Sequence, residues 1–368
     1  MKIALIFSSK CSTYLPPKGF NIAGLYDTQA LTGSESGIFN VARGLCELGH
    51  QVDVFCKVME PWLNVERLAG ANVYPQDAPM SGDYDAYISW NDPDHLPSQR
   101  TRGIKICSQQ LNDFSISDTV YDRRVDLYAF PSQVHLDFMV KKSKLDLRKC
   151  VVVPNSTNLE FFKPSNAREE GSIVYISSPD RGLHHLLDIF PLVKERVNHA
   201  TLKIFYRFWP WYEVTKNGDD LVGQRARHIR NSLLRLGQNN ENGVTLVGPV
   251  NNRALADVLS NTMVLAYPCL PTQFTEGFSI AILDACAAGC VPVISDVDAL
   301  PSIYEDVACI VRGNPGKRRE VWADEIAYLL TNDRARADTA KKTMAFAAKY
   351  SRQEVSKMWE RTIMERSQ

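Results

Sequence analysis

The 368-residue chain has no excess of charge of either sign, since Lys plus Arg and Asp plus Glu both number 42 and the formal net charge is zero. Proteins that bind the nucleic-acid backbone usually carry a basic excess. The charge balance therefore argues mildly against a nucleic-acid partner. Hydrophobic residues make up 45% and charged residues 23% of the chain, which is close to the globular average and excludes disordered and low-complexity classes.

The sequence also lacks cysteine pairs and long apolar runs. Its nine cysteines are widely spaced and include no CxxC pair, so we expect reduced thiols rather than a zinc site or a disulfide scaffold. No stretch approaches 18 uncharged apolar residues, and the apolar run at residues 3–7 is too short for a signal peptide. We expect a cytoplasmic protein that associates with the inner face of a membrane at most peripherally. A basic stretch at residues 141–149 is either a solvated helix face or a contact to anionic headgroups.

Several catalytic motifs are missing as well. The sequence has no GxSxG, Walker A or HExxH motif. Its seven histidines are dispersed, and the two that are adjacent, His184 and His185, would face different sides of a helix. We therefore expect neither a metal site nor a resident cofactor.

Short apolar runs alternate with helical spacings along the whole chain. Residues 3–7, 34–48 and 51–55 read as strand, helix and strand, which is a βαβ unit. The same alternation recurs after a polar, proline-containing stretch near residues 155–166. We expect an α/β protein with two doubly wound Rossmann-like domains that face each other across a cleft. Further strands are expected at residues 86–89, 104–107, 127–130, 151–154, 173–177, 202–206, 244–247, 264–267 and 291–295, and a helical tail at 324–367.

Three segments carry candidate binding residues, each with a plainer reading. Gly33 and Ser34 open the first helix, where a glycine loop suits an anion, although Ser34 could simply cap the helix. Arg181 follows a strand and could bind phosphate in a bidentate fork, or it could be an exposed arginine. Glu276 stands at the mouth of a predicted helix at residues 278–288, and Asp284 follows eight residues later, about 12 Å of helix rise. Two such carboxylates could bind the hydroxyls of one extended ligand, or they could be a cap and a solvated side chain.

These segments, in their order and spacing, resemble the retaining family-4 glycosyltransferases of the GT-B fold (glycosyl transferases group 1). The resemblance rests on the glycine loop and its helix at residues 33–55, on residues 153–164, and on the Arg-Gly-Leu segment at 181–183. It rests further on residues 246–250 and, most specifically, on the Glu-Gly-Phe-Ser segment that starts at Glu276.

The resemblance implies a role for each matched residue. Gly33 and Ser34 would approach the donor diphosphate, and Arg181 would take the place of the usual phosphate-binding lysine. Val250 would lie near the nucleotide base. Glu276 would bind hydroxyls of the donor sugar, Asp284 would bind the ribose, and the helix start would meet the sugar and the phosphates through Gly277, Phe278 and Ser279.

The chain departs from the family pattern at two places. The basic residue expected five positions before the lysine is absent, because that position is Ile176. The histidine–aspartate pair near the acceptor appears as Asn112 and Asp113, and an asparagine cannot titrate, although its amide can bind a sugar hydroxyl. Catalytic roles are therefore expected for Glu276, Arg181, Asn112 and Asp113.

By the same resemblance, residues 1–155 form an acceptor-side domain to which the helix at 350–368 crosses back, and residues 156–349 bind the nucleotide sugar. The resemblance implies metal-independent transfer, with retention of configuration, from a nucleotide-diphosphate sugar to a hydroxyl of a glycan, lipid-linked or small-molecule acceptor. A sugar-nucleotide-binding protein without transfer activity remains an alternative because of Asn112. Another GT-B enzyme, such as an epimerase or a phosphorylase, and a transferase that modifies DNA bases also remain open.

Overall fold

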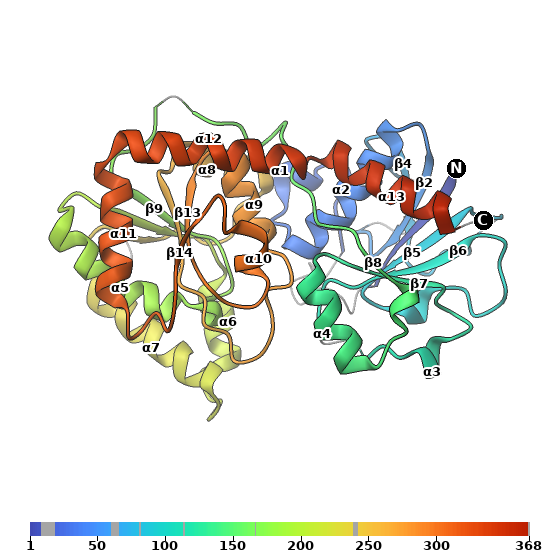
Figure 1. Ribbon diagram of the computed structural model, residues 1–368, viewed down its shortest axis with the longest axis horizontal. Coiled ribbons are helices and arrows are strands. Elements are labelled where there is room, and N and C mark those ends of the chain that lie inside the picture. The colour runs from blue at the N-terminus through green and yellow to red at the C-terminus, as the bar shows by residue number, and fades with distance from the viewer. Residues whose placement is uncertain are drawn as a thin grey trace. The chain divides into compact units, whose positions relative to one another are not determined.

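The computed structural model describes residues 1–8, 19–59, 66–80, 82–112, 115–165, 167–237 and 242–366 (Figure 1). The chain divides into two compact units. Unit 1 consists of Met1–Asn158 and Lys349–Gln368, and unit 2 of Leu159–Ala348. Within the described part of the chain, no helix is both long and apolar enough to cross a membrane.

Unit 1 is built on an eight-stranded sheet with the order β3-β4-β2-β1-β5-β6-β7-β8. All neighbouring strands are parallel except the edge pair β3 and β4. Central strands such as β1 are buried over nearly their whole length, as expected for a parallel sheet covered by helices on both faces. The strands are β1 (Lys2–Phe7), β2 (Gln51–Cys56), β3 (Glu66–Leu68), β4 (Ala71–Pro75), β5 (Ala86–Trp90), β6 (Ile104–Ser108), β7 (Leu127–Phe130) and β8 (Cys150–Val152). The helices are α1 (Leu25–Thr28), α2 (Gly33–Glu47), α3 (Asp118–Tyr121), α4 (Gln133–Ser143) and α13 (Arg352–Arg366), with 3-10 turns η2 (Pro93–His95) and η3 (Leu147–Lys149).

The start of α2 differs from the sequence prediction. Thr32, and not Ser34, is the N-cap, and it forms a capping box in which its backbone N–H donates to Glu35 Oε2 at 2.7 Å. Ser34 lies inside the first turn, which frees its hydroxyl for contacts with another element. Gly49, with a φ of 86°, follows the helix in the left-handed conformation that glycine adopts without steric cost.

Unit 2 is built on a six-stranded parallel sheet with the order β11-β10-β9-β12-β13-β14. Figure 1 shows its strands between α5 and α11 on one side and α9 and α10 on the other. The aromatic segment that begins at Phe208 forms helix α6, which accommodates Pro210 because the proline falls in the first turn, where no backbone hydrogen bond is lost. The strands are β9 (Ser172–Tyr175), β10 (Thr201–Ile204), β11 (Val244–Leu246), β12 (Val264–Tyr267), β13 (Val291–Ser295) and β14 (Cys309–Val311). The helices are α5 (Leu183–Arg196), α6 (Phe208–Thr215), α7 (Leu221–Leu236), α8 (Asn252–Asn261), α9 (Ile280–Ala287), α10 (Leu300–Tyr304), α11 (Arg319–Thr331) and α12 (Asp333–Lys349), with the 3-10 turn η4 (Pro179–Arg181).

Each sheet has one point at which the strand order reverses. In unit 1 the reversal lies between β1 and β5, and in unit 2 between β9 and β12. Loops that leave such neighbouring strands run to opposite faces of the sheet and open a crevice at their carboxyl ends. The two reversal points are therefore where binding residues are expected.

The chain ends in helix α13, which packs on α2 within unit 1. Trp359 and Ile363 belong to the unit 1 core, and Arg352 donates to both carboxylate oxygens of Glu47 at 2.7 and 3.1 Å. This confirms that the C-terminal helix crosses back to the first domain. The tail is not one continuous helix, however, since α11, α12 and α13 are separate and Ser351 pairs with Thr157 between the last two.

Candidate functional site

Glu276 is the centre of a buried polar network in unit 2. Its side chain is only 2% exposed, and Oε1 accepts hydrogen bonds from Arg181 Nη1 at 2.8 Å and from Tyr267 Oη at 2.9 Å. Tyr267 Oη in turn accepts from the Ser177 hydroxyl at 3.1 Å. The network joins the carboxyl end of β12 to the segments that follow β9, which is the reversal point of this sheet.

The ionisation of the network follows from its burial. Burial acts to lower the pKa of Arg181, but the neighbouring groups, Glu276 foremost, together outweigh this effect and raise the pKa above its usual value. Burial raises the pKa of Tyr267 well above its usual value, and that of the neighbouring Cys269 thiol as well. Arg181 is therefore a permanent cation, Tyr267 a hydrogen-bond donor, and Cys269 an inert thiol.

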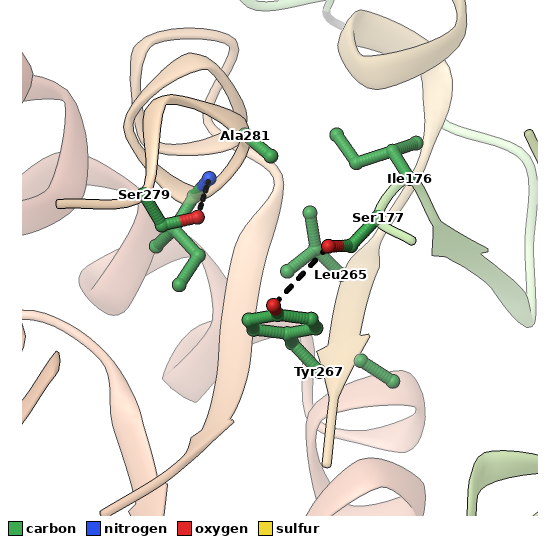
Figure 2. A pocket seen from close by; sticks show the side chains of 8 residues that line it. Ile176, Ser177, Leu265, Tyr267, Ser279 and Ala281 are labelled. Carbon is green, nitrogen blue, oxygen red and sulfur yellow. Dashed lines mark hydrogen bonds between the residues drawn. The ribbon is translucent and has the colours of Figure 1, made fainter. Parts of the chain in front are cut away.

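A small recess opens beside this network, and Figure 2 shows it with Ser177 facing Tyr267. One wall is the beginning of α9, where the Ser279 hydroxyl caps the Ile282 N–H at 3.5 Å. The N-terminus of a helix attracts negative charge, because its N–H groups and dipole point outward. The recess is lined by Ile176, Ser177, Leu265, Ala266, Tyr267, Ser279, Ala281 and Ile282.

Arg181 is held in place by the short turn η4 and by its successor, Gly182. Gly182 has a φ of 126°, and a Cβ atom there would lie 2.1 Å from the carbonyl oxygen of Pro268. Only glycine permits this close approach between the Arg181 turn and the segment after β12. Arg225 of α7 donates to the carbonyl oxygen of Asp180 at 2.7 Å and supports the same turn from the other side.

The other predicted site residues of unit 2 lie at the start of α9, within α9 and in the loop before α8. Helix α9 begins at Ile280, so Gly277, Phe278 and Ser279 precede it, with Ser279 as the N-cap. Glu276 therefore lies outside the helix, and the helix rise predicted between it and Asp284 does not apply. Asp284 is buried within α9 at 7% exposure. Val250 lies in the loop between β11 and α8, and no described contact connects it to Glu276.

In unit 1, Ser34 reaches the carboxyl end of β5. Its hydroxyl oxygen accepts hydrogen bonds from Trp90 Nε1 at 3.2 Å and from Asn91 Nδ2 at 3.3 Å. Asn91 has a φ of 67°, and its Oδ1 accepts the backbone N–H groups of Gln110 and Leu111, which follow β6. Helix α2 is thus bound to the reversal point of the first sheet through Trp90 and Asn91, which belong to no sequence motif.

Asn112 lies next to a histidine that the sequence analysis did not single out. Asn112 Oδ1 accepts a hydrogen bond from His135 Nε2 at 2.7 Å, and His135 is buried at the start of α4. Burial, together with the charge of Lys142, lowers the pKa of His135 to about 4, so the ring is neutral at neutral pH. The chain has Asn112 where the family pattern has a histidine, but His135 of α4 lies beside it. Asp113 lies outside the described residues.

Within the basic stretch at residues 141–149, two side chains lie next to carboxylates. Arg148 pairs with Asp146, Lys149 lies 3.2 Å from Asp122, and Lys142 donates to the Asn112 carbonyl. Among the described residues, no group of three or more His, Cys, Asp or Glu side chains is placed to hold a metal ion.

The Glu276 network lies in the part of the chain that is similar to a known protein family. Residues 171–332 match the family model described as glycosyl transferases group 1, and this range includes Arg181, Glu276 and Asp284. A phosphatidylinositol N-acetylglucosaminyltransferase protein of Arabidopsis thaliana is 25% identical over 198 residues. That match covers 52% of this chain and only 38% of the plant protein.

Solved structures of low sequence identity share the fold along the whole chain. The sucrose-phosphate synthase from Thermosynechococcus elongatus superposes with a TM-score of 0.69 at 15% identity, over 99% of this chain and 98% of its own. The E. coli trehalose-6-phosphate structure bound with UDP-2-fluoro glucose gives 0.65 at 11% identity, over 99% of both chains. These likenesses confirm the predicted GT-B fold, and the family match confirms the predicted resemblance to group 1 glycosyl transferases.

Proposed function

We propose that the protein is a glycosyltransferase that moves a sugar from a nucleotide-diphosphate sugar to a hydroxyl group of a glycan or glycolipid. The carrying observation is the Arg181–Glu276 pair at the reversal point of unit 2, inside the segment that matches the group 1 glycosyl transferases. A cation and a carboxylate joined at one point suit a ligand that combines a diphosphate with sugar hydroxyls.

The donor would lie along the recess of unit 2. Among the described residues, the hydrogen bonds to the Glu276 side chain go to Oε1, so Oε2 is available to accept from hydroxyls of the donor sugar. The start of α9 would face the diphosphate, with Ser279 at its cap, and Arg181 would turn to the same phosphates. The structure with UDP-2-fluoro glucose supports a nucleotide sugar as the ligand of this fold. Roles for Asp284 at the ribose, for Val250 at the base, and for Gly33 at the diphosphate belong to this proposal.

The chemistry we propose is transfer with retention of configuration and without a metal. The acceptor hydroxyl attacks the face of the sugar from which the phosphate departs, and the departing phosphate takes the proton. The new C–O bond forms as the bond from the anomeric carbon to the phosphate breaks, and the electron pair of that bond leaves with the nucleoside diphosphate. Arg181 and the start of α9 stabilise the charge that develops on this leaving group, as preorganised donors do in other enzymes.

The acceptor side is proposed for unit 1, around Asn112 and the neutral His135. The buried His135 holds the Asn112 side chain through the 2.7 Å hydrogen bond, and the Asn112 amide would meet a hydroxyl of the acceptor sugar. If the acceptor is lipid-linked, contact with the membrane would be peripheral. The pairing of Arg148 and Lys149 with carboxylates favours a solvated helix face over a contact to anionic headgroups.

The test is a thermal-shift screen with UDP-, GDP-, ADP- and TDP-sugars, because a ligand that binds the folded state raises the unfolding midpoint by mass action. We expect one nucleotide series to raise the midpoint, and the sugar nucleotide to raise it more than the free diphosphate. No shift with any member would contradict the proposal. Binding followed by no transfer to any acceptor and no release of nucleoside diphosphate would favour a sugar-nucleotide-binding protein instead.

A further inference from the structure

Asp298 lies in the turn between β13 and α10 and has no role in the network described above. Its backbone adopts a φ of 51°, in the left-handed region where glycine is at ease and other residues are uncommon. Its side chain explains why a residue other than glycine stands there. Asp298 Oδ2 accepts two backbone hydrogen bonds, from the Thr275 N–H at 2.8 Å and from the Glu276 N–H at 2.9 Å.

The same turn also holds the other side of Glu276. The N–H of Ala299 donates to the Glu276 carbonyl oxygen at 3.1 Å. The N–H and the C=O of Glu276 are therefore both bound by consecutive residues of one turn. This arrangement fixes the backbone of Glu276, and with it the direction in which the side chain leaves the chain.

We propose that Asp298 is a positioning residue that sets Glu276 for the sugar of the donor, an inference that rests on the proposed function. Arg181 and Tyr267 restrain the tip of the Glu276 side chain, and Asp298 restrains its base. A carboxylate that accepts two N–H groups forms charge-assisted hydrogen bonds, which are stronger than neutral ones. Asp298 accepts from the Thr275 and Glu276 N–H groups, so its loss should disturb Glu276 and the sugar while leaving the diphosphate contacts of Arg181 in place.

The experiment compares three variants. Asp298→Gly removes the acceptor and relieves the left-handed backbone, so it separates the hydrogen bonds from strain. Asp298→Asn keeps an acceptor oxygen of the same reach and loses the charge. The matched control is Asp296→Ala, because Asp296 lies two residues earlier and likewise accepts one backbone N–H, from Gly313 at 2.9 Å, away from Glu276.

Two readouts are measured on the full chain. The first is amide hydrogen exchange at residues 275 and 276 without ligand. The second is the ratio of affinities for a sugar nucleotide and its free diphosphate, measured by calorimetry with UDP-glucose and UDP, GDP-mannose and GDP, ADP-glucose and ADP, and TDP-glucose and TDP.

We expect Asp298→Gly to speed exchange at residues 275 and 276 and to reduce the affinity ratio by about tenfold, since small displacements of a positioned group are costly. Affinity for the free diphosphate should change by less than about twofold, and Asp298→Asn and Asp296→Ala should keep the ratio within about threefold. Should Asp298→Gly fail to fold, a tenfold loss of the ratio in a folded Asp298→Asn with unchanged exchange would overturn the proposal.

The outcomes separate this inference from the proposed function. If the wild-type protein prefers a sugar nucleotide and Asp298→Gly keeps that preference, the positioning role is wrong and the proposed function stands. An equal loss of affinity for sugar nucleotide and diphosphate would indicate a merely structural role and would also overturn the inference. If the wild-type protein binds a sugar nucleotide no more tightly than its diphosphate, Glu276 adds nothing to sugar binding and the inference fails while the proposed function stands. If it binds no sugar nucleotide at all, both fail.

Discussion

Arg181 is the residue whose surroundings define its chemistry most sharply. Its side chain is 32% exposed, while that of its partner Glu276 is almost fully buried. The cation is thus paired with a buried carboxylate, and part of its side chain remains accessible to solvent. A permanently charged guanidinium in that position suits a phosphate ligand. A purely structural ion pair would not require part of the arginine side chain to be exposed.

Replacing Arg181 should weaken the binding of the nucleoside diphosphate. We expect Arg181→Ala to reduce affinity by about tenfold or more, because a hydrogen bond to a charged group contributes roughly 1.5–3 kcal/mol. The affinity of Arg181→Lys should lie between that of Arg181→Ala and that of the wild type, since lysine keeps the charge but lacks the planar guanidinium. The measurement is calorimetric titration with the free diphosphate found in the thermal-shift screen.

The matched control is Arg196→Ala, which removes an arginine paired with Glu320 and Asp324 on the surface of the same unit. Its affinity for the diphosphate should equal that of the wild type. An Arg181→Ala protein with unchanged affinity would remove Arg181 from the phosphate site.

Buried histidines make stability depend on pH. Burial is the main cause that lowers the pKa of His135 to about 4 and that of His185 to about 4, with contributions from Lys142 and Arg225, respectively. In each case the pKa of the folded state is below the usual value of about 6.5, so the unfolded chain binds more protons between those values. The free energy of unfolding should therefore fall as the pH is lowered from about 6.5 toward 4.

Urea unfolding at a series of pH values between 7 and 5 tests this dependence. His135 lies in unit 1, so His135→Gln should flatten the pH dependence of that unit and leave that of unit 2 unchanged. Stability that stays constant over the interval, or a slope that the variant does not alter, would show that these rings are not buried in the neutral form.

At the scale of elements, the contact between the Arg181 turn and the segment after β12 depends on one glycine. Gly182→Ala would place a Cβ atom 2.1 Å from the Pro268 carbonyl oxygen at a φ of 126°. We expect a loss of more than about 1 kcal/mol in the free energy of unfolding of unit 2, with weaker diphosphate binding as Arg181 shifts. Thermal unfolding and calorimetric titration measure the two effects.

Gly248→Ala provides the control for this substitution. Gly248 also has a positive φ, 91°, but nothing lies within 4 Å of the Cβ position. The free energy of unfolding of Gly248→Ala should fall only by the backbone cost of about 1–2 kcal/mol, and its affinity for the diphosphate should equal that of the wild type. Equal effects of the two variants on binding would contradict a specific role for the Gly182 contact.

Helix α13 is part of the first core although it ends the chain. Deleting residues 350–368 should destabilise unit 1 more than unit 2, because it removes Val355, Trp359 and Ile363 from that core. The single change Trp359→Ala should cost about 3–5 kcal/mol in unit 1. The neighbouring Met358 is 37% exposed, so Met358→Ala should cost far less.

Differential scanning calorimetry can assign these losses if the two units unfold in separate transitions, and hydrogen exchange can assign them by segment. A truncated chain with full stability and full activity would contradict the structural role of α13.

At the scale of the whole molecule, regular periodicity made most elements predictable. Buried strands such as β1 and β12 are short apolar runs between polar loops, and the sequence predicts them directly. Strands β3 and β4 were not predicted, because they form the sheet edge and β3 has only three residues. Helix α7 was not predicted either, and its many arginines obscure an apolar stripe that the structure buries.

The candidate site was predictable residue by residue but not as an arrangement. Arg181 and Glu276 each follow a strand in the sequence, yet they are 95 residues apart and meet only because β9 and β12 are neighbours in the sheet. Tyr267, His135 and Asp298 carry no local motif, since their roles come from contacts to other segments. The order of the strands in the sheets brings these segments together, and that order cannot be read from the spacing of residues along the chain.

The most direct measurement is the release of nucleoside diphosphate from UDP-, GDP-, ADP- and TDP-sugars by the wild-type protein and by Glu276→Gln. Gln keeps the size of the side chain and an acceptor oxygen but loses the charge, so the protein should still fold, with a thermal midpoint lowered by the loss of the ion pair with Arg181. We predict that the wild type consumes one donor, slowly with water and faster with a hydroxyl acceptor, and that Glu276→Gln is slower by about 100-fold or more. No release from any donor by the wild type, or equal rates for the two proteins, would contradict a glycosyltransferase that binds its donor sugar through Glu276.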